Sequence, residues 1–181
     1  MVVLVTGANG QLGQAIQFIA NNYLNLNFVF CNSTDLDISN KENCQAVFHK
    51  IKPDFCINAA AYTAVDKAES EQDKAELINV TGDKNLAETC KELDAKLIHI
   101  STDFVFDGEK GNYNEKDKAN PLSHYAQSKV DAENLLLNNV DYNNWSIVRT
   151  IIVYGTGKNL SRSNLICWTI SALKKNEVIK V

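Results

Sequence analysis

Long apolar runs, clusters of positive charge and closely spaced cysteines are all missing from this sequence. No stretch of its 181 residues approaches the roughly 18 consecutive apolar residues that mark a membrane-spanning helix. The formal net charge is -4 and no basic block stands out, which argues against nucleic acid or an anionic membrane as a partner. The sequence opens without a secretory leader. We therefore expect a soluble, cytoplasmic protein with no nucleic-acid or membrane partner.

The cysteines and histidines are too dispersed to predict a metal or redox centre. No Cys-x-x-Cys pair occurs, and the three histidines stand at positions 49, 99 and 124. Isolated cysteines are typical of reduced thiols packed in a core. The five are Cys31, Cys44, Cys56, Cys90 and Cys167. A hydrophobic fraction of 45% over this length predicts one sizeable core and hence one domain over residues 1–181.

The N-terminus holds a glycine-rich junction, MVVLVTGANGQLG. The apolar residues 2–5 predict a buried parallel strand, and an apolar face starting at Gln11 predicts a helix directly after it. The spacing of Gly7, Gly10 and Gly13 suits a tight turn, a close approach of a pyrophosphate to the backbone, and close packing of helix on strand. The unpaired N–H groups of the helix start then attract phosphate. The junction therefore predicts a dinucleotide-binding loop.

Strand-like and helix-like segments alternate along the rest of the chain. Further strands are predicted over residues 27–31, 54–58, 96–101, 145–149 and 178–181, and helices over 39–52, 70–93, 123–138 and 161–175. Ser39 and Glu42 have the spacing of a capping box. The helical region over 70–93 has a weak point near Thr81 and Gly82, so its pattern fits either one helix or two. This alternation predicts an α/β fold with a doubly wound parallel sheet, whose ligands bind at the carboxyl ends of the strands.

A second motif, Tyr125-Ala-Gln-Ser-Lys129, lies on the helix predicted over residues 123–138. Residues four apart share a helix face, so the lysine ammonium can approach the phenol and lower the pKa of the tyrosine. Ser101 and Thr102, at the end of a predicted strand, could hold a carbonyl oxygen against that phenol. A second copy of the spacing begins at Tyr154, but two glycines interrupt it, so we predict no helix there.

Together these segments resemble a known family. GANGQLG, INAAAYTAVDKAE, HISTDFVFDG, NPLSHYAQSK and RTIIVYG are similar to the extended short-chain dehydrogenase/reductases, and within them to the dTDP-4-dehydrorhamnose reductases. The resemblance implies a Rossmann fold, NADPH or NADH as cofactor, and hydride transfer to the C4 keto group of a nucleotide sugar. Members of that family continue well beyond residue 181, so we expect the C-terminal substrate-binding region to be missing here.

The resemblance also assigns roles to individual residues. Thr102, Tyr125 and Lys129 are the implied catalytic residues, and Thr102 and Asp103 are the implied sugar contacts. The implied cofactor residues are Gly7, Gly10, Gln11, Leu12 and Gly13 in the phosphate loop, Asp37 and Ile38 at the adenine, Ala61, Tyr62 and Thr63 along the middle of the cofactor, and Ile100, Tyr125 and Lys129 near the nicotinamide half.

Some departures from the family pattern keep alternatives open. The stretch Cys31-Asn32-Ser33 has neither the acid that holds a ribose hydroxyl nor a basic residue, so it does not choose between NADH and NADPH. Ile152 stands where the subfamily has an aromatic sugar contact. A non-catalytic regulatory subunit, resembling that of methionine adenosyltransferase, and another nucleotide-sugar epimerase or dehydratase are the alternative functions. A homodimer is possible on the same resemblance.

Overall fold

The structure is a computed structural model that describes residues 1–139, 141–160 and 164–178. Five parallel strands form one sheet in the order β2-β1-β3-β4-β5. The strands are β1 (Val2–Thr6), β2 (Asn27–Phe30), β3 (Phe55–Asn58), β4 (Lys96–Thr102) and β5 (Trp145–Thr150). Their bounds agree with the predicted ranges to within one residue. The predicted strand over 178–181 falls largely on residues outside the described part of the chain.

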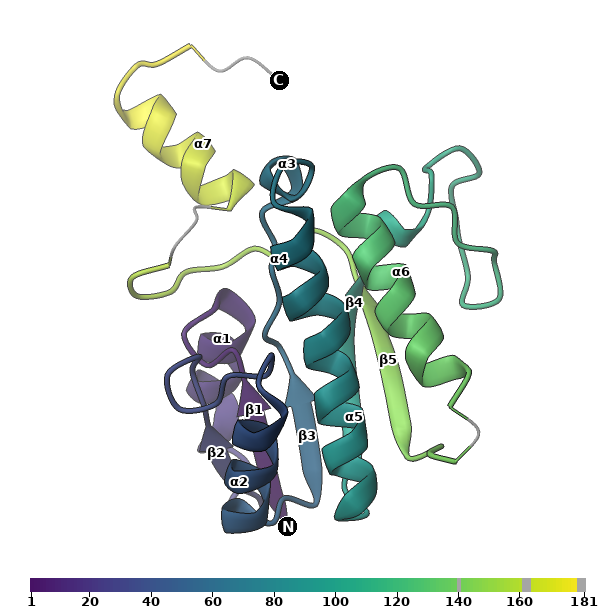
Figure 1. Cartoon of the computed structure of the whole chain (residues 1–181). Helices are drawn as coiled ribbons and strands as arrows, with labels where there is room; N and C mark the ends of the chain where they lie inside the picture. The colour runs from purple at the N-terminus through teal and green to yellow at the C-terminus, as the bar shows by residue number, and fades with distance from the viewer. Residues whose placement is uncertain (140, 161–163, 179–181) are drawn as a thin grey trace.

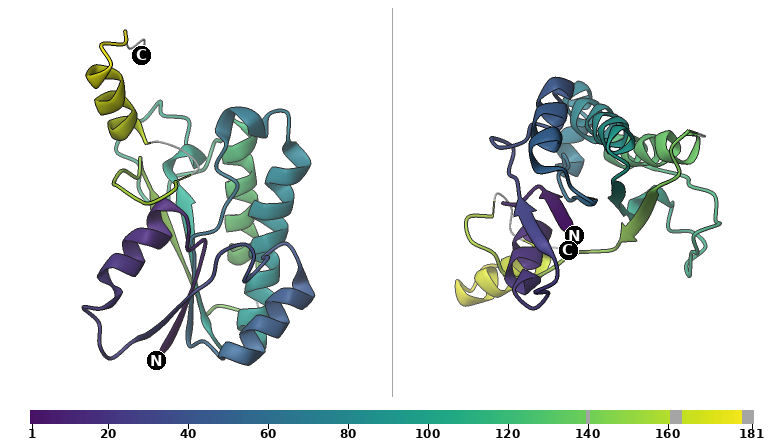
Figure 2. Two further views of the ribbon diagram at one scale, coloured as in Figure 1. Left: turned by 90° about the vertical axis from the view of Figure 1, so that its left-hand side faces the viewer. Right: turned by 90° about the horizontal axis from the view of Figure 1, so that it is seen from below.

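Helices lie on both faces of the sheet. They are α1 (Gln11–Ala20), α2 (Lys41–Ile51), α3 (Val65–Ala68), α4 (Gln72–Glu76), α5 (Gly82–Glu92), α6 (His124–Leu137) and α7 (Leu165–Lys174), with a π-helical turn η1 (Leu77–Thr81) and a 3₁₀ turn η2 (Asp103–Val105). In Figure 1, α2, α5 and α6 cover the face of the sheet toward the viewer, and the edge-on view in Figure 2 places α1 on the opposite face. The doubly wound α/β fold predicted from the sequence is confirmed.

The central strands are buried because they are apolar along their whole length. Four of the five residues of β1 are buried, as expected for a parallel strand with helices on both faces. Leu4, Phe48, Leu86 and Leu97 are fully buried in the main core. Four of the predicted core cysteines are buried there or beside it with free thiols, and Cys167 is partly exposed. In the described part of the chain no helix is both long and apolar enough to cross a membrane.

Three local predictions need correction. The capping box at Ser39 and Glu42 is wrong: helix α2 is capped by Asn40, whose side chain accepts a hydrogen bond from the N–H of Asn43 at 2.8 Å. The helix predicted over 70–93 does not break at its weak point. It continues through the π-helical turn η1 into α5. The turn after β3 contains the short helix α3, which the sequence pattern did not indicate.

The correction at α2 gives a stability prediction. Asn40→Ala removes the oxygen that pairs with the N–H of Asn43, and should lower the free energy of unfolding by about 1 kcal/mol. Ser39→Ala is the matched control, because the Ser39 hydroxyl bonds Asp37 and not the first turn of α2. Urea unfolding of both variants measures the difference. An equal or larger loss in Ser39→Ala would contradict the assignment of the cap.

Candidate functional site

A cavity of about 470 Å³ opens above the carboxyl ends of β1, β3, β4 and β5. Most of the residues predicted for cofactor and substrate line it, although they come from segments far apart in the sequence. Those that do are Gly10, Gln11, Leu12, Ala61, Thr63, Ile100, Thr102, Asp103, Tyr125 and Lys129. The parallel sheet brings them together because all the strand ends that carry them point to the same edge.

The glycine junction between β1 and α1 is shaped by close backbone contacts. Gly7 has a φ of +65°, and a Cβ built on it would lie 2.5 Å from the carbonyl oxygen of Ala59. A Cβ on Gly13 would overlap the carbonyl oxygen of Gly7. These two glycines therefore do not line the cavity themselves. They let the strand end, the helix start and the end of β3 come close together.

Gly10 is different, because little protein surrounds it. Among the described residues, a Cβ there would meet only the carbonyl oxygen of Gly7, at 3.2 Å, so the missing side chain leaves room on the cavity side. Gly10 is also the N-cap of α1, without a side-chain cap and without an acidic residue in the first turn. The first N–H groups of the helix and its positive end thus face the cavity uncompensated, which suits a phosphate group.

Tyr125 and Lys129 lie one turn apart on α6 and both line the cavity, as their spacing predicted. Helix α6 is fixed at its start by Ser123, whose hydroxyl accepts from the N–H of Ala126 at 3.2 Å. The ring of Phe104 meets that of Tyr125 edge-on, with centroids 6.2 Å apart. Thr102, at the end of β4, accepts a hydrogen bond from the N–H of Phe104. The three implied catalytic side chains therefore share one wall.

The electrostatics of this wall differ from the prediction. Lys129 was expected to lower the pKa of Tyr125, but burial of the phenol raises that pKa, a hydrogen bond with Thr102 opposes the rise, and Asp103 adds to it. Burial lowers the pKa of Lys129, while the carboxylates of Asp83 and Glu133 raise it. A buried phenol with a raised pKa stays protonated at neutral pH and can donate its proton.

Besides Gly7 and Gly13, three implied cofactor residues do not line this cavity. Asp37 is exposed, and its carboxylate accepts hydrogen bonds from the N–H and hydroxyl of Ser39. Ile38 is buried in the main core, where its side chain fills the space beside Gly82. The side chain of Tyr62 packs into a small second core cluster, with its hydroxyl 3.0 Å from a carboxylate oxygen of Glu71.

Ser101, singled out from the sequence together with Thr102, lines the cavity at the end of β4, but its hydroxyl donates to the carboxylate of Glu133 at 2.5 Å. Asn58 lines the cavity from the end of β3 and was not predicted, although a systematic reading of strand ends would have found it.

Asn79 is a stronger omission, because it lies in the π-helical turn and bridges two site segments. Its amide pairs with both the N–H and the carbonyl of Tyr62, and donates to the hydroxyl of Ser128 at 2.9 Å. The side chain of Asn79 therefore fixes α6 against the loop after β3.

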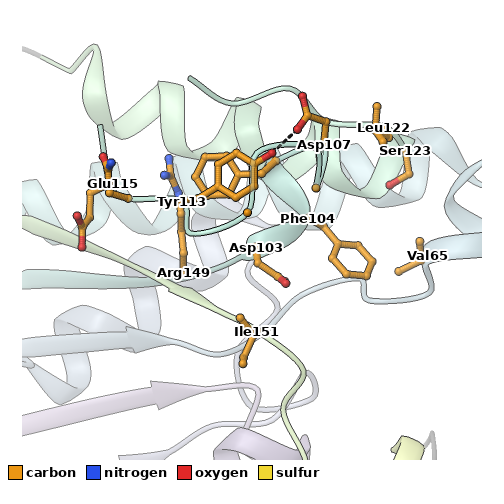
Figure 3. Close-up of a pocket in the computed structure, with 14 residues that line it drawn as sticks. Val65, Asp103, Phe104, Asp107, Tyr113, Glu115, Leu122, Ser123, Arg149 and Ile151 are labelled. Atoms are coloured by element: carbon orange, nitrogen blue, oxygen red, sulfur yellow. Dashed lines mark hydrogen bonds between the residues drawn. The ribbon is translucent and has the colours of Figure 1, made fainter. Parts of the chain in front are cut away.

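A second cavity of about 740 Å³ adjoins the first, and Figure 3 shows its lining. Val65, Asp103, Phe104 and Ile151 line both cavities. The far wall belongs to the loop after η2, where the rings of Phe106 and Tyr113 stack with centroids 4.2 Å apart. The loop after η2 thus forms one side of a hollow continuous with the first cavity.

The shared cavity, the glycine junction and the Tyr125–Lys129 pair are the features of a short-chain dehydrogenase/reductase. The comparisons with known proteins agree with this class. The family described as "RmlD substrate binding domain" matches residues 1–181, and the chain belongs to it. Thermus thermophilus UDP-glucose 4-epimerase, 22% identical with a TM-score of 0.84, shares the fold.

Several similar proteins are named dTDP-4-dehydrorhamnose reductase. A dTDP-4-dehydrorhamnose reductase from Shigella flexneri is 38% identical over 91% of this chain and 56% of its own length. The solved reductase from Bacillus anthracis, in complex with NADP, is 36% identical with a TM-score of 0.88, over 96% of this chain and 60% of that one. The reductase from Clostridium acetobutylicum is 39% identical with a TM-score of 0.87. The chain spans a little over half the length of such relatives.

The loop of the second cavity gives a pH prediction. The Asp107 carboxylate accepts from the hydroxyl of Tyr113 and from Asn120, and these bonds, led by that of Tyr113, lower its pKa from 3.8 to about 2. Because the folded pKa is depressed, the carboxylate stabilises the loop above about pH 4 and loses that effect as the pH falls toward about 2. NMR signals of the Tyr113 ring should change over that interval.

Two variants of the same loop test the assignment. Asp107→Asn should alter the Tyr113 signals already at neutral pH, because the charged acceptor of the phenol is gone. Glu109→Gln removes a neighbouring exposed carboxylate and should leave them as they are. Identical acid titrations of the Tyr113 ring in the native chain and in Asp107→Asn would contradict the role given to Asp107.

Proposed function

We propose that this chain is the dinucleotide-binding part of a dTDP-4-dehydrorhamnose reductase, an enzyme of dTDP-rhamnose biosynthesis. The proposal rests on one observation above all: Thr102, Tyr125 and Lys129 face the same cavity as the uncapped start of α1. A dinucleotide in that cavity and a sugar in the adjoining one would meet at the wall that both cavities share.

The residues present fit a nicotinamide dinucleotide. The open side of Gly10 and the first N–H groups of α1 would hold the diphosphate. Ala61 and Thr63 would lie along its middle, and Ile100 beneath the nicotinamide half. The turn at Asn32 carries neither an acid directed at a ribose hydroxyl nor an arginine. We assign NADPH as the coenzyme because the similar Bacillus anthracis reductase is described in complex with NADP.

When bound, the nicotinamide supplies the hydride that reduces the C4 carbonyl of the sugar. The residues of this chain supply position and a proton. Thr102 and Asp103 hold the sugar, with the Thr102 hydroxyl orienting the carbonyl oxygen. Tyr125, kept protonated by burial, donates its phenolic proton to that oxygen, so a hydroxyl group forms as C4 is reduced. The Lys129 ammonium, which borders the same cavity, would stabilise the phenolate left by the transfer and bind the nicotinamide ribose.

One feature favours a reductase over a dehydratase on the same scaffold. A dehydratase needs a further acid and base next to the tyrosine, and the residue after Asp103 is Phe104. Its ring lies edge-on against Tyr125 and brings no titratable group. The regulatory-subunit alternative is less favoured, because the proton donor and both its partners are present. A homodimer stays a prediction.

The proton donor is tested by Tyr125→Phe. Loss of the phenolic proton should reduce substrate-dependent NADPH oxidation by roughly 10²- to 10⁴-fold, while the affinity for NADPH stays close to that of the native chain. Tyr154→Phe is the matched control, since Tyr154 is exposed and belongs to the interrupted copy of the motif. Turnover of dTDP-4-dehydrorhamnose and NADPH fluorescence are the measurements. Both variants are made in a full-length version that includes the C-terminal region expected to bind the sugar. Equal turnover in both variants would refute the mechanism, and NADPH binding with no turnover by the unmutated full-length protein would favour the regulatory subunit.

The phosphate loop is tested by Gly10→Val. A branched side chain would fill the space left for the diphosphate and should abolish NADPH binding, with Gly10→Ala giving a smaller loss. The fold should tolerate the change, since in the part of the chain that the structure describes one backbone atom alone lies near the new Cβ. Ala15→Val, on an exposed position of the same helix, controls for helix propensity. Undiminished fluorescence titration by Gly10→Val would reject the loop as the binding site.

A further inference from the structure

The loop after η2, residues 106–119, forms the far wall of the second cavity and folds on itself. The stacked rings of Phe106 and Tyr113 lie at its centre. Over residues 1–139, 141–160 and 164–178, every hydrogen bond and ion pair of this loop ends within residues 103–120. These contacts give the loop a shape of its own, but they do not join it to the sheet.

Arg149, near the end of β5, makes that connection. Its guanidinium lies over the ring of Phe106, 5.0 Å from the centroid, where the electrons of the ring face attract a cation. Figure 3 shows the Arg149 side chain extending from β5 toward Tyr113. Of the ring contacts that the described residues make with the loop, this one alone comes from outside it. The position of the aromatic wall therefore depends on where the guanidinium is held.

The guanidinium is held from behind by a buried carboxylate. Nε and Nη2 of Arg149 donate to the two oxygens of Glu133, at 2.9 Å and 2.6 Å. Glu133 is 2% exposed and also accepts from the hydroxyl of Ser101 at 2.5 Å. A bidentate pair of this kind fixes the plane of the guanidinium. Arg149 thus links the loop in front to α6 and the end of β4 behind.

The charges of the second cavity indicate what it can hold. Asp103, Asp107 and Glu115 line it with carboxylates, whereas Arg149 is the one cation among the described lining residues. Because Glu133 already pairs with that cation, the cavity disfavours an anionic group such as a diphosphate. Aromatic walls with a few polar groups fix the orientation of an uncharged ligand. The sugar ring of a nucleotide sugar is such a group.

We propose that Arg149 is a positioning residue for the sugar, which docks the loop on the sheet and thereby sets the shape of the second cavity. Glu133 keeps the guanidinium in place, and Phe106 receives it. The inference rests on the proposed function, in which the sugar occupies this cavity. Neither Arg149 nor Phe106 lines the first cavity, so loss of their contact should affect the sugar and leave the dinucleotide bound.

Arg149→Lys and Phe106→Leu test the docking in a full-length version. Lysine keeps the charge but loses the planar fork that binds Glu133 and stacks on a ring. Leucine removes the ring and keeps an apolar side chain. Each change should raise the KM for dTDP-4-dehydrorhamnose roughly 2- to 30-fold, the range of a cation–π contact, with a smaller change in kcat. The affinity for NADPH should match that of the unmutated protein.

Val148→Thr is the matched control. Val148 precedes Arg149 on β5 and is exposed, and neighbouring side chains of a strand point to opposite faces. This variant disturbs β5 without touching the contact between Arg149 and Phe106, so its KM should equal that of the unmutated protein.

The double variant separates positioning from general damage to the fold. If Arg149 acts through Phe106, the two effects on KM are not additive, and the double variant has the KM of the more affected single variant. Independent structural damage would multiply the effects and would weaken NADPH binding as well. Either of those results would overturn the proposal, as would a KM in Arg149→Lys equal to that of Val148→Thr.

The ring of Tyr113 reports the docking without any substrate. Its NMR signals should change in Arg149→Lys and stay as they are in Val148→Thr. If Arg149→Lys does not fold, Phe106→Leu decides: a raised KM with unchanged NADPH affinity supports the proposal, and an unchanged KM refutes it. If the unmutated full-length protein does not turn over dTDP-4-dehydrorhamnose, the proposed function fails, while the Tyr113 signals still support or overturn the docking by Arg149.

Discussion

The closeness of three backbone segments is the constraint on which this site depends. Gly7 and Gly13 leave no room for side chains where the end of β1, the start of α1 and the end of β3 meet. Any Cβ at these points would separate the segments by more than the protein interior can absorb. The start of α1 would then turn away from the wall that holds Tyr125. Packing at the glycines thus determines where an anion can bind relative to a proton donor more than 100 residues later in the sequence.

The other wall of the site depends on buried polar contacts. Asn79 and Asp83 lie on one long helix and reach the loop after β3, helix α6 and strand β4. Each of these groups would be costly to bury unpaired, so the contacts specify a single arrangement of the helices on the sheet. The apolar core gives the sheet and helices their stability. The polar contacts decide how α6, and with it the tyrosine and lysine, is oriented toward the cavity.

Features of the fold and the site that depend on neighbouring residues could be predicted from the sequence, whereas those that depend on contacts between distant segments could not. Strand order in sequence, the glycine junction and the shared face of Tyr125 and Lys129 follow from local patterns, and the structure agrees with them. The α2 cap was missed because Ser39 and Asn40 are adjacent and both are good cap residues. The pKa of Tyr125 was misjudged because the spacing of the motif reveals the lysine but not the burial of the phenol. The buried partners of Asp83 come from β3 and β4, so no local pattern could reveal them.

The π-helical turn between α4 and α5 has a structural consequence of its own. A π turn accommodates one residue more than the α-helical turn it replaces, so the helix beyond it is rotated by roughly 100° relative to an uninterrupted α-helix. Deleting a single residue from η1 would restore regular winding and swing the buried side of α5 sideways. Asp83 would leave His99, and the amide of Asn58 would lose its buried acceptor. The extra residue in η1 therefore sets the orientation of α5 relative to α4.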